Sequence, residues 1–200
     1  MTHILFIPGA GGAASFWHPL GERLPRDWRK VYLNWPGAGH ERHDPTIRSF
    51  ADYTRFAAWY LDPQGSVVIA QSMGGTVAVR LALQFPDRVT HLVLAATSGG
   101  VAMDRHQAAD WRRDYRAEYP QAADWITAER PDHTAGIGRI KAPTLLLWGD
   151  ADPVSPVAVG QHLHSLLPDA RLHVVPGGDH GFARDRADEI APLVLAHLQR

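Results

Sequence analysis

The chain has 200 residues, of which 45% are hydrophobic, and its 20 basic and 21 acidic side chains give a formal net charge of −1. This length predicts one globular domain with a sizeable core, and the near-neutral charge argues against a nucleic-acid partner. The absence of cysteine excludes disulfides, thiolate metal sites and a cysteine nucleophile. No apolar run reaches the roughly 18 residues of a membrane span, and residues 4–7 lack the basic flank of a signal peptide, so we expect a soluble cytoplasmic protein without a membrane partner.

Short apolar, β-rich runs alternate along the chain with longer helical patterns, which predicts βαβ units and a parallel sheet. The six runs are residues 3–7, 30–34, 66–70, 89–95, 144–148 and 171–175. Ser49, with Asp52 three residues later, forms a capping-box pattern for one helix. Asp188 is expected to cap the last helix, with Pro192 in its first turn. The predicted fold class is therefore α/β, with a mainly parallel sheet of about six strands and helices on both faces.

Residues 97–140 separate the fourth and fifth predicted strands and are too many for a simple connection. We expect an insertion with structure of its own, a small helical cap within a single domain that spans residues 1–200. Inside it, Trp111, Tyr115 and Tyr119 recur at i, i+4 and i+8, which predicts one helix with three rings on one face. Packing of this face on the domain is the favoured interpretation, substrate contact is the alternative, and one face can do both.

A serine lies alone where the third predicted strand meets a helix that opens with two glycines. Residues 70–74 read Ala-Gln-Ser-Met-Gly, which fits the nucleophile-elbow pattern G-x-S-x-G with Ala70 in place of the first glycine. Small residues two positions before and after Ser72 would let the strand and the helix approach closely. The alternative, a serine that only caps the helix, does not need this strand–turn–helix context.

A serine hydroxyl needs a histidine base and a carboxylate that orients the base. Asp150 and Asp152 follow the fifth predicted strand, and His180 follows the sixth. Because loops at the carboxyl ends of parallel strands line one crevice, we expect Ser72, one aspartate and His180 to meet there. Pro153 restricts its predecessor to extended backbone, which favours Asp152 as the orienting carboxylate.

With these motifs the sequence resembles the α/β-hydrolase family over nearly its whole length. The resemblance also rests on residues 8–12 (Pro-Gly-Ala-Gly-Gly), residues 35–40, residues 85–89, and the acid and base motifs Gly149-x-x-Asp152 and Gly178-x-His180. It implies that Ser72 is the nucleophile, His180 the base and Asp152 the orienting acid. It further implies an oxyanion hole made by the backbone N–H groups of Ala10 and Met73, and no metal or cofactor.

Three features depart from the family pattern. The first strand begins at once, so we expect a trimmed core of six strands. Pro8 stands where many members have histidine, which should alter the oxyanion loop more than the chemistry, because the hole is made by backbone groups. The insertion is small, which favours an accessible site and a small or extended acyl substrate.

The sequence therefore predicts a serine hydrolase that acts by acyl transfer on a small-molecule substrate, a carboxylic ester in the first instance. A carbon–carbon bond hydrolase or a lyase on the same fold is the alternative; it would need cationic groups in the insertion, where Arg105, Arg112 and Arg113 are available. Residues next to the motifs are expected to form the apolar substrate pocket. They are Phe16, Trp17, Met73, Val154 and Phe182, and His40, in the loop beside the crevice, is a further candidate for substrate contact.

Two other functions are disfavoured. The pattern Gly9-x-Gly11-x-x-Ala14 fits a dinucleotide fingerprint, but that site needs an acidic residue at the end of the next strand, and the first acid, Glu41, lies beyond a Pro-Gly turn. A non-catalytic ligand receptor is disfavoured by the complete set of triad residues. Residues 40–43 (His-Glu-Arg-His) lack the i, i+4 spacing of a helical metal site, so we expect a solvated loop and no metal.

Overall fold

The computed structural model describes residues 1–199. Within them, six strands form one sheet in the order β2-β1-β3-β4-β5-β6, and every neighbouring pair is parallel. The strands are β1 (His3–Ile7), β2 (Arg29–Tyr32), β3 (Ser66–Gln71), β4 (Val89–Ala95), β5 (Thr144–Gly149) and β6 (Ala170–Val175). The predicted parallel sheet is confirmed, and the predicted strand ends differ from the observed ones by at most two residues.

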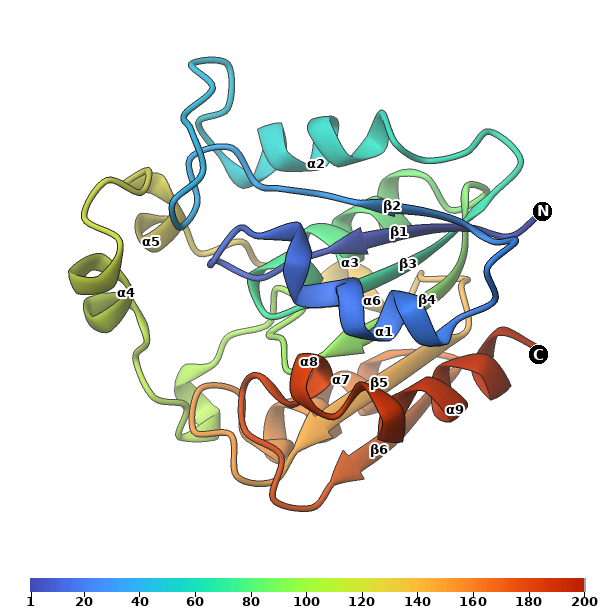
Figure 1. Cartoon of the computed structure of the whole chain (residues 1–200). Helices are drawn as coiled ribbons and strands as arrows, with labels where there is room; N and C mark the ends of the chain where they lie inside the picture. The colour runs from blue at the N-terminus through green and yellow to red at the C-terminus, as the bar shows by residue number, and fades with distance from the viewer. Residues whose placement is uncertain (200) are drawn as a thin grey trace.

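Helices cover both faces of the sheet (Figure 1). On one face lie the 3₁₀ turn η1 (Ala14–Trp17) and the helices α1 (His18–Arg23), α8 (Phe182–Asp185) and α9 (Ala187–Leu198). On the other lie α2 (Phe50–Ala58), α3 (Met73–Gln84) and α7 (Val157–Leu166). No helix among residues 1–199 is long and apolar enough to cross a bilayer.

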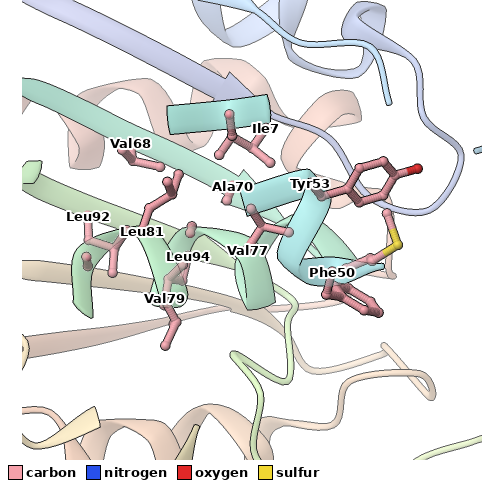
Figure 2. Close-up of a cluster of buried hydrophobic side chains, with 14 of the residues drawn as sticks. Ile7, Phe50, Tyr53, Val68, Ala70, Val77, Val79, Leu81, Leu92 and Leu94 are labelled. Carbon is pink, nitrogen blue, oxygen red and sulfur yellow. The ribbon is translucent and has the colours of Figure 1, made fainter. Parts of the chain in front are cut away.

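The two faces are specified by the alternation of side chains along the strands. Ile4 and Phe6 of β1 belong to the core on the side of α1, whereas Leu5 and Ile7 belong to the core on the side of α3. Because parallel pairing aligns equivalent positions, neighbouring strands repeat this division. Figure 2 shows the α3 side, where strand side chains meet those of α3, with Phe50 and Tyr53 of α2 beside them; the strand and α3 residues labelled there are Ile7, Val68, Ala70, Leu92 and Leu94 and then Val77, Val79 and Leu81.

The helix ends test two further predictions. Ser49 caps α2 as expected: its Oγ accepts from the backbone N–H of Asp52 at 3.1 Å. The prediction for Asp188 is wrong, because α9 begins at Ala187 and α8 ends only two residues earlier, which leaves Arg186 in the cap position. Asp188 instead lies in the first turn and pairs with Arg23 of α1, and Pro192 lies in the helix interior rather than in the first turn.

The segment between β4 and β5 carries four short helical pieces, η2 (Asp104–His106), α4 (Arg112–Glu118), α5 (Trp125–Ala128) and α6 (Thr134–Ile137). In Figure 1, α4 and α5 lie beyond the carboxyl ends of the strands, away from the sheet, whereas α6 returns to contact α3. The sheet order places the later strands on the far side of β1 from β2, so the loops after β1 and β3 diverge at a topological switch point. Such a point is where ligands bind in open α/β sheets.

Candidate active site

Ser72 lies on a strained turn between β3 and α3. Its backbone has φ 51° and ψ −126°, a conformation that costs a non-glycine residue on the order of 1–3 kcal/mol. Hydrogen bonds hold this residue on both sides. Its N–H donates to the Ala95 carbonyl at 3.0 Å, and its own carbonyl accepts from the Gly75 N–H at 2.9 Å and from Thr97 Oγ1 at 2.5 Å.

The two glycines after Ser72 are required by close packing. A Cβ on Gly74 would lie 2.3 Å from the carbonyl oxygen of Pro8, and a Cβ on Gly75 would lie 2.3 Å from Thr97 Oγ1. The first turn of α3 can therefore approach the loop after β1 and the end of β4 only without side chains at these positions. The sequence pattern thus encodes the turn that holds the Ser72 hydroxyl out of the sheet.

Ser72, His180 and Asp152 form one continuous chain of hydrogen bonds. His180 Nε2 lies 2.9 Å from Ser72 Oγ, and His180 Nδ1 lies 2.7 Å from Asp152 Oδ2. The Asp152 side chain is fully buried, whereas that of His180 is 30% exposed. These three side chains, from the loops after β3, β5 and β6, are brought together as the sequence predicts, in the geometry that general-base activation of a hydroxyl requires.

The two candidate aspartates have different surroundings. The second oxygen of Asp152, Oδ1, accepts from the backbone N–H groups of Val154 at 2.8 Å and Ser155 at 3.1 Å. Asp150 is exposed, and its Oδ1 accepts from the Gly177 N–H at 2.6 Å. Asp152 therefore faces the imidazole, and Asp150 connects the loop after β5 to the loop after β6.

The two residues predicted to supply an oxyanion hole, Ala10 and Met73, each line a cavity that Ser72 also lines. Met73 is the first residue of α3, so its N–H has no acceptor within the helix. Ala10 follows Gly9, whose carbonyl accepts from the Gly12 N–H at 3.1 Å. Because a trans peptide directs its C=O and N–H in opposite directions, this bond also sets the direction of the Ala10 N–H. The assignment of both groups to an oxyanion hole stays a prediction.

Ser72 and His180 lie where two cavities of about 590 and 560 Å³ adjoin. The first cavity extends along the loop after β1 and under α4, and the second extends over the start of α3 toward η2 and α5. Either volume is in the range that holds a drug-sized ligand. The residues that line both are Ser72, Ala109, Asp110, Trp111, Val154 and His180.

A family model described as alpha/beta hydrolase fold matches residues 2–134. The chain belongs to the alpha/beta hydrolase fold family. A second model, described as TAP-like protein, matches residues 107–199. The fold and the family that the sequence motifs predict are thereby confirmed.

Relatives of this alpha/beta hydrolase carry several activities in their names. A poly(3-hydroxyalkanoate) depolymerase from Ectopseudomonas oleovorans is 27% identical over 100% of this chain and 85% of its own length. A 2-hydroxy-6-oxononadienedioate/2-hydroxy-6-oxononatrienedioate hydrolase from Burkholderia vietnamiensis is 25% identical over 96% of this chain and 84% of its own. Among solved structures, an esterase from Exiguobacterium antarcticum matches with a TM-score of 0.83 at 15% identity, over 100% of this chain and 92% of its own.

The predicted pocket residues of this hydrolase divide into two groups. Phe16 and Val154 line cavities, as expected. Trp17 is fully buried in the core on the α1 side, where its Nε1 donates to the Ile7 carbonyl at 2.9 Å, and Phe182 is buried in the same cluster. Neither ring lines either cavity among the described residues, so their prediction as substrate contacts needs correction. Successive side chains of a helical turn point in different directions, and adjacency to Phe16 or His180 in sequence did not place them in the pocket.

His40 is also outside both cavity linings. It is exposed, its Nδ1 lies 2.8 Å from Gln121 Nε2, and its ring meets that of Tyr119 edge-on at 4.9 Å. Its partners are therefore residues of the insertion. No group of three or more metal-binding side chains is found in the part of the chain that the structure describes, residues 40–43 included.

Sequence reasoning missed two supports of the site and one arginine. Gln71 is buried, and its Nε2 donates to the His180 carbonyl at 3.1 Å, which ties the loop after β6 to the nucleophile turn. Thr97 supports the Ser72 carbonyl, as described above. Arg130 lines the second cavity, where burial and the charge of Arg112 lower its pKa. Gln71 could have been found from its place beside Ser72, but only the folded chain brings the other two near it.

The aromatic row of the insertion both packs and lines the site. Trp111 and Tyr119 flank α4 at its two ends, Tyr115 lies within it, and neighbouring rings lie 5.4 and 5.0 Å apart. All three line the first cavity. The single helix predicted from their spacing is confirmed; its aromatic face packs within the insertion and also lines the cavity, and contact with substrate stays a prediction.

Proposed function

We propose that this alpha/beta hydrolase is a serine hydrolase that acts by acyl transfer on carboxylic esters. The observation that carries the proposal is the hydrogen-bonded series from Ser72 Oγ through His180 to the buried carboxylate of Asp152. A carboxylate whose other oxygen accepts two backbone N–H groups is held in place and directs Nδ1–H of the imidazole toward itself. Nε2 is then left as an acceptor for the proton of Ser72.

The reaction follows from these positions. Ser72 Oγ attacks the substrate carbonyl while His180 Nε2 takes its proton, and the carbonyl oxygen becomes an oxyanion that the N–H groups of Ala10 and Met73 would stabilise. His180 then gives the proton to the leaving alkoxide. Water attacks the acyl-enzyme in the same way, with His180 as base, and the acid product leaves as Ser72 regains its proton. The residues 97–140 are proposed to act as a small cap that closes both cavities.

The charges in the cavities favour an ester over a substrate with several carboxylates. In the first cavity the charged lining residues are Asp110, Asp114, Glu118 and Arg184; in the second they are Asp104, Asp110, Arg112, Glu129, Arg130 and Asp132. Acids outnumber bases in both, and Arg184 and Arg112 pair with Asp185 and Asp110. Two adjoining cavities also accommodate a substrate with sizeable groups on both sides of the scissile bond.

A carbon–carbon bond hydrolase is the second candidate. Arg112 and Arg130 in the second cavity favour it, since they could hold one carboxylate, and one relative bears the name of a dioate hydrolase. Arg105 and Arg113, which the sequence offers as cationic groups for such a substrate, do not line either cavity within residues 1–199.

Labelling and turnover test the proposal together. A fluorophosphonate probe should label the wild type and not Ser72→Ala, and kcat on p-nitrophenyl esters should fall on the order of 10⁴ to 10⁶-fold. Ser165→Ala, at an exposed serine of α7, is the matched control and should keep both labelling and turnover.

Three outcomes would contradict it in different ways. Labelling that survives Ser72→Ala places the nucleophile elsewhere. Cleavage of a vinylogous diketone with no turnover of esters of any acyl length favours the carbon–carbon bond hydrolase. Neither labelling nor turnover in the wild type favours a ligand receptor.

A further inference from the structure

Tyr115 connects the insertion to the loop that follows β1. Its hydroxyl donates to the Ala10 carbonyl at 2.8 Å and accepts from the Gly39 N–H at 2.9 Å. The side chain is 7% exposed, and burial raises its pKa, so the hydroxyl stays a donor throughout the neutral range. One group of the insertion therefore bonds two loops that the sequence places far from it.

The loop after β1 is rich in glycine, so its conformation depends on hydrogen bonds and backbone contacts. Residues 9–12 read Gly-Ala-Gly-Gly, and glycine loses more conformational freedom on ordering than any other residue. Gly12 is confined, because its φ is +80° and a Cβ there would lie 2.7 Å from the Ala38 carbonyl oxygen. Gly11 is not confined: a Cβ there would meet nothing within 4 Å. No neighbour crowds the side-chain position of Gly11, so the conformation of the Ala10–Gly11 peptide is fixed by backbone contacts, among them the close approach of Gly39 to the Gly11 carbonyl, and by hydrogen bonds.

Two hydrogen bonds hold the two peptide planes that meet at the Ala10 Cα. The Gly12 N–H bonds the Gly9 carbonyl and so holds the Gly9–Ala10 peptide plane. Tyr115 bonds the Ala10 carbonyl and so holds the Ala10–Gly11 peptide plane. With both planes held, φ and ψ of Ala10 are set, and so is the direction of the Ala10 N–H. If the Tyr115 bond is lost, ψ at Ala10 can change, which moves the Gly12 N–H away from the Gly9 carbonyl. The bond that holds the Gly9–Ala10 plane is then weakened, and the direction of the Ala10 N–H broadens.

We propose that Tyr115 is a positioning residue that holds the Ala10 N–H in the direction needed to bind the oxyanion. The inference rests on the proposed function, because it assigns Tyr115 to the hydrolytic reaction at Ser72. It makes the insertion part of the catalytic geometry and not only a cover over the cavities. Tyr115 acts through the loop and does not itself touch the reacting atoms.

Tyr115→Phe removes the hydroxyl and keeps the ring on its neighbours. We expect kcat to fall about 10-fold, less than the 10²–10³-fold loss of a whole oxyanion-hole donor, because the N–H remains and only its direction broadens. KM should stay within about twofold, since a transition-state interaction alone is weakened. Affinity for a trifluoromethyl ketone, whose tetrahedral adduct on Ser72 places an oxyanion in the hole, should fall by the same factor as kcat.

Tyr53→Phe is the matched control. Tyr53 is also a buried tyrosine, and its hydroxyl donates to the Pro36 carbonyl at 2.9 Å and not to residues 9–12, and Tyr53 lines neither cavity. Its loss removes a hydrogen bond from a partly buried carbonyl, as Tyr115→Phe does, so both variants should lose thermal stability. Only Tyr115→Phe should lose kcat per active site, with active sites counted by fluorophosphonate titration so that misfolded protein is excluded.

Gly11→Ala supplies a second, independent test. Gly11 has open space for a methyl group and does not adopt a positive φ, so alanine fits and restricts the loop. Adding Gly11→Ala to Tyr115→Phe should restore part of the lost kcat. Unchanged kcat in Tyr115→Phe, an equal loss in Tyr53→Phe, or a double variant as slow as Tyr115→Phe would overturn the inference. If the fluorophosphonate labels Ser72 of the wild type and the wild type hydrolyses esters, the proposed function stands even when the inference about Tyr115 fails.

Discussion

The substitution Asp152→Asn tests the orienting role that we propose for this carboxylate. The backbone N–H groups of Val154 and Ser155 both point at Oδ1, so an asparagine would keep its oxygen there and turn its NH₂ group toward His180 Nδ1. Nδ1 must then accept, and Nε2 must carry the ring proton. The imidazole is left in the tautomer that cannot take the proton of Ser72.

The expected loss is large and confined to chemistry. A wrong tautomer in a Ser-His-Asp triad lowers kcat on the order of 10⁴-fold, equivalent to about 5 kcal/mol of transition-state stabilisation. Thermal unfolding should change little, because the amide has the same shape and keeps the two backbone hydrogen bonds. Steady-state hydrolysis of a p-nitrophenyl ester and a melting curve measure the two quantities.

Asp150→Asn is the matched control two residues away. Its amide oxygen can still accept from the Gly177 N–H, so we expect only a modest loss of activity. If Asp152→Asn keeps kcat within tenfold of the wild type, or if Asp150→Asn shows the larger loss, the orienting role of Asp152 is refuted.

Two further predictions concern the pocket and the core. Trp17→Ala should cost about 3–5 kcal/mol of unfolding free energy in a denaturant melt, because the ring is fully buried. Phe16→Ala should instead shift the preference among ester substrates of different acyl length, because Phe16 lines a cavity. The reverse pattern would contradict the placement of Trp17 in the core and Phe16 in the pocket. Burial, aided by the charge of Arg80, lowers the pKa of His133, so the unfolded chain binds a proton more readily. The unfolding free energy should therefore fall as pH drops below about 6.5 and the fall should be smaller in His133→Gln; equal pH profiles in urea melts would refute this.

Local patterns were sufficient where one physical requirement acts on neighbouring residues. The strands follow from short apolar runs that are buried on both faces of a sheet, and the turn at Ser72 follows from Gly74 and Gly75, where an added Cβ atom would collide with Pro8 and Thr97. The spacing of the aromatic row predicted one face of α4. In each case the residues that specify the local structure lie within a few positions of it in the sequence.

Patterns failed where a residue acts across the fold. Trp17 lies next to Phe16 in sequence, yet the turn η1 directs one ring into the core and the other toward the cavity. Tyr115 was singled out for its ring, and nothing in its spacing indicated that its hydroxyl meets Ala10 and Gly39. Such hydrogen bonds depend on how the insertion folds back over the loops after β1 and β2. A local pattern of residues does not predict that path.

The alanine that replaces the first glycine of the elbow pattern shows how the fold decides which small residues it needs. Gly74 faces backbone, and a methyl group there would overlap the Pro8 carbonyl. Ala70, in contrast, is the last strand position whose side chain points toward α3, and it is buried in the cluster that Figure 2 shows with Ile7 and Leu94. A methyl group at this position fills core space and avoids the conformational freedom of glycine. The strained turn at Ser72 therefore needs glycine two residues after the serine. The position two residues before the serine accepts alanine, because its side chain belongs to the core.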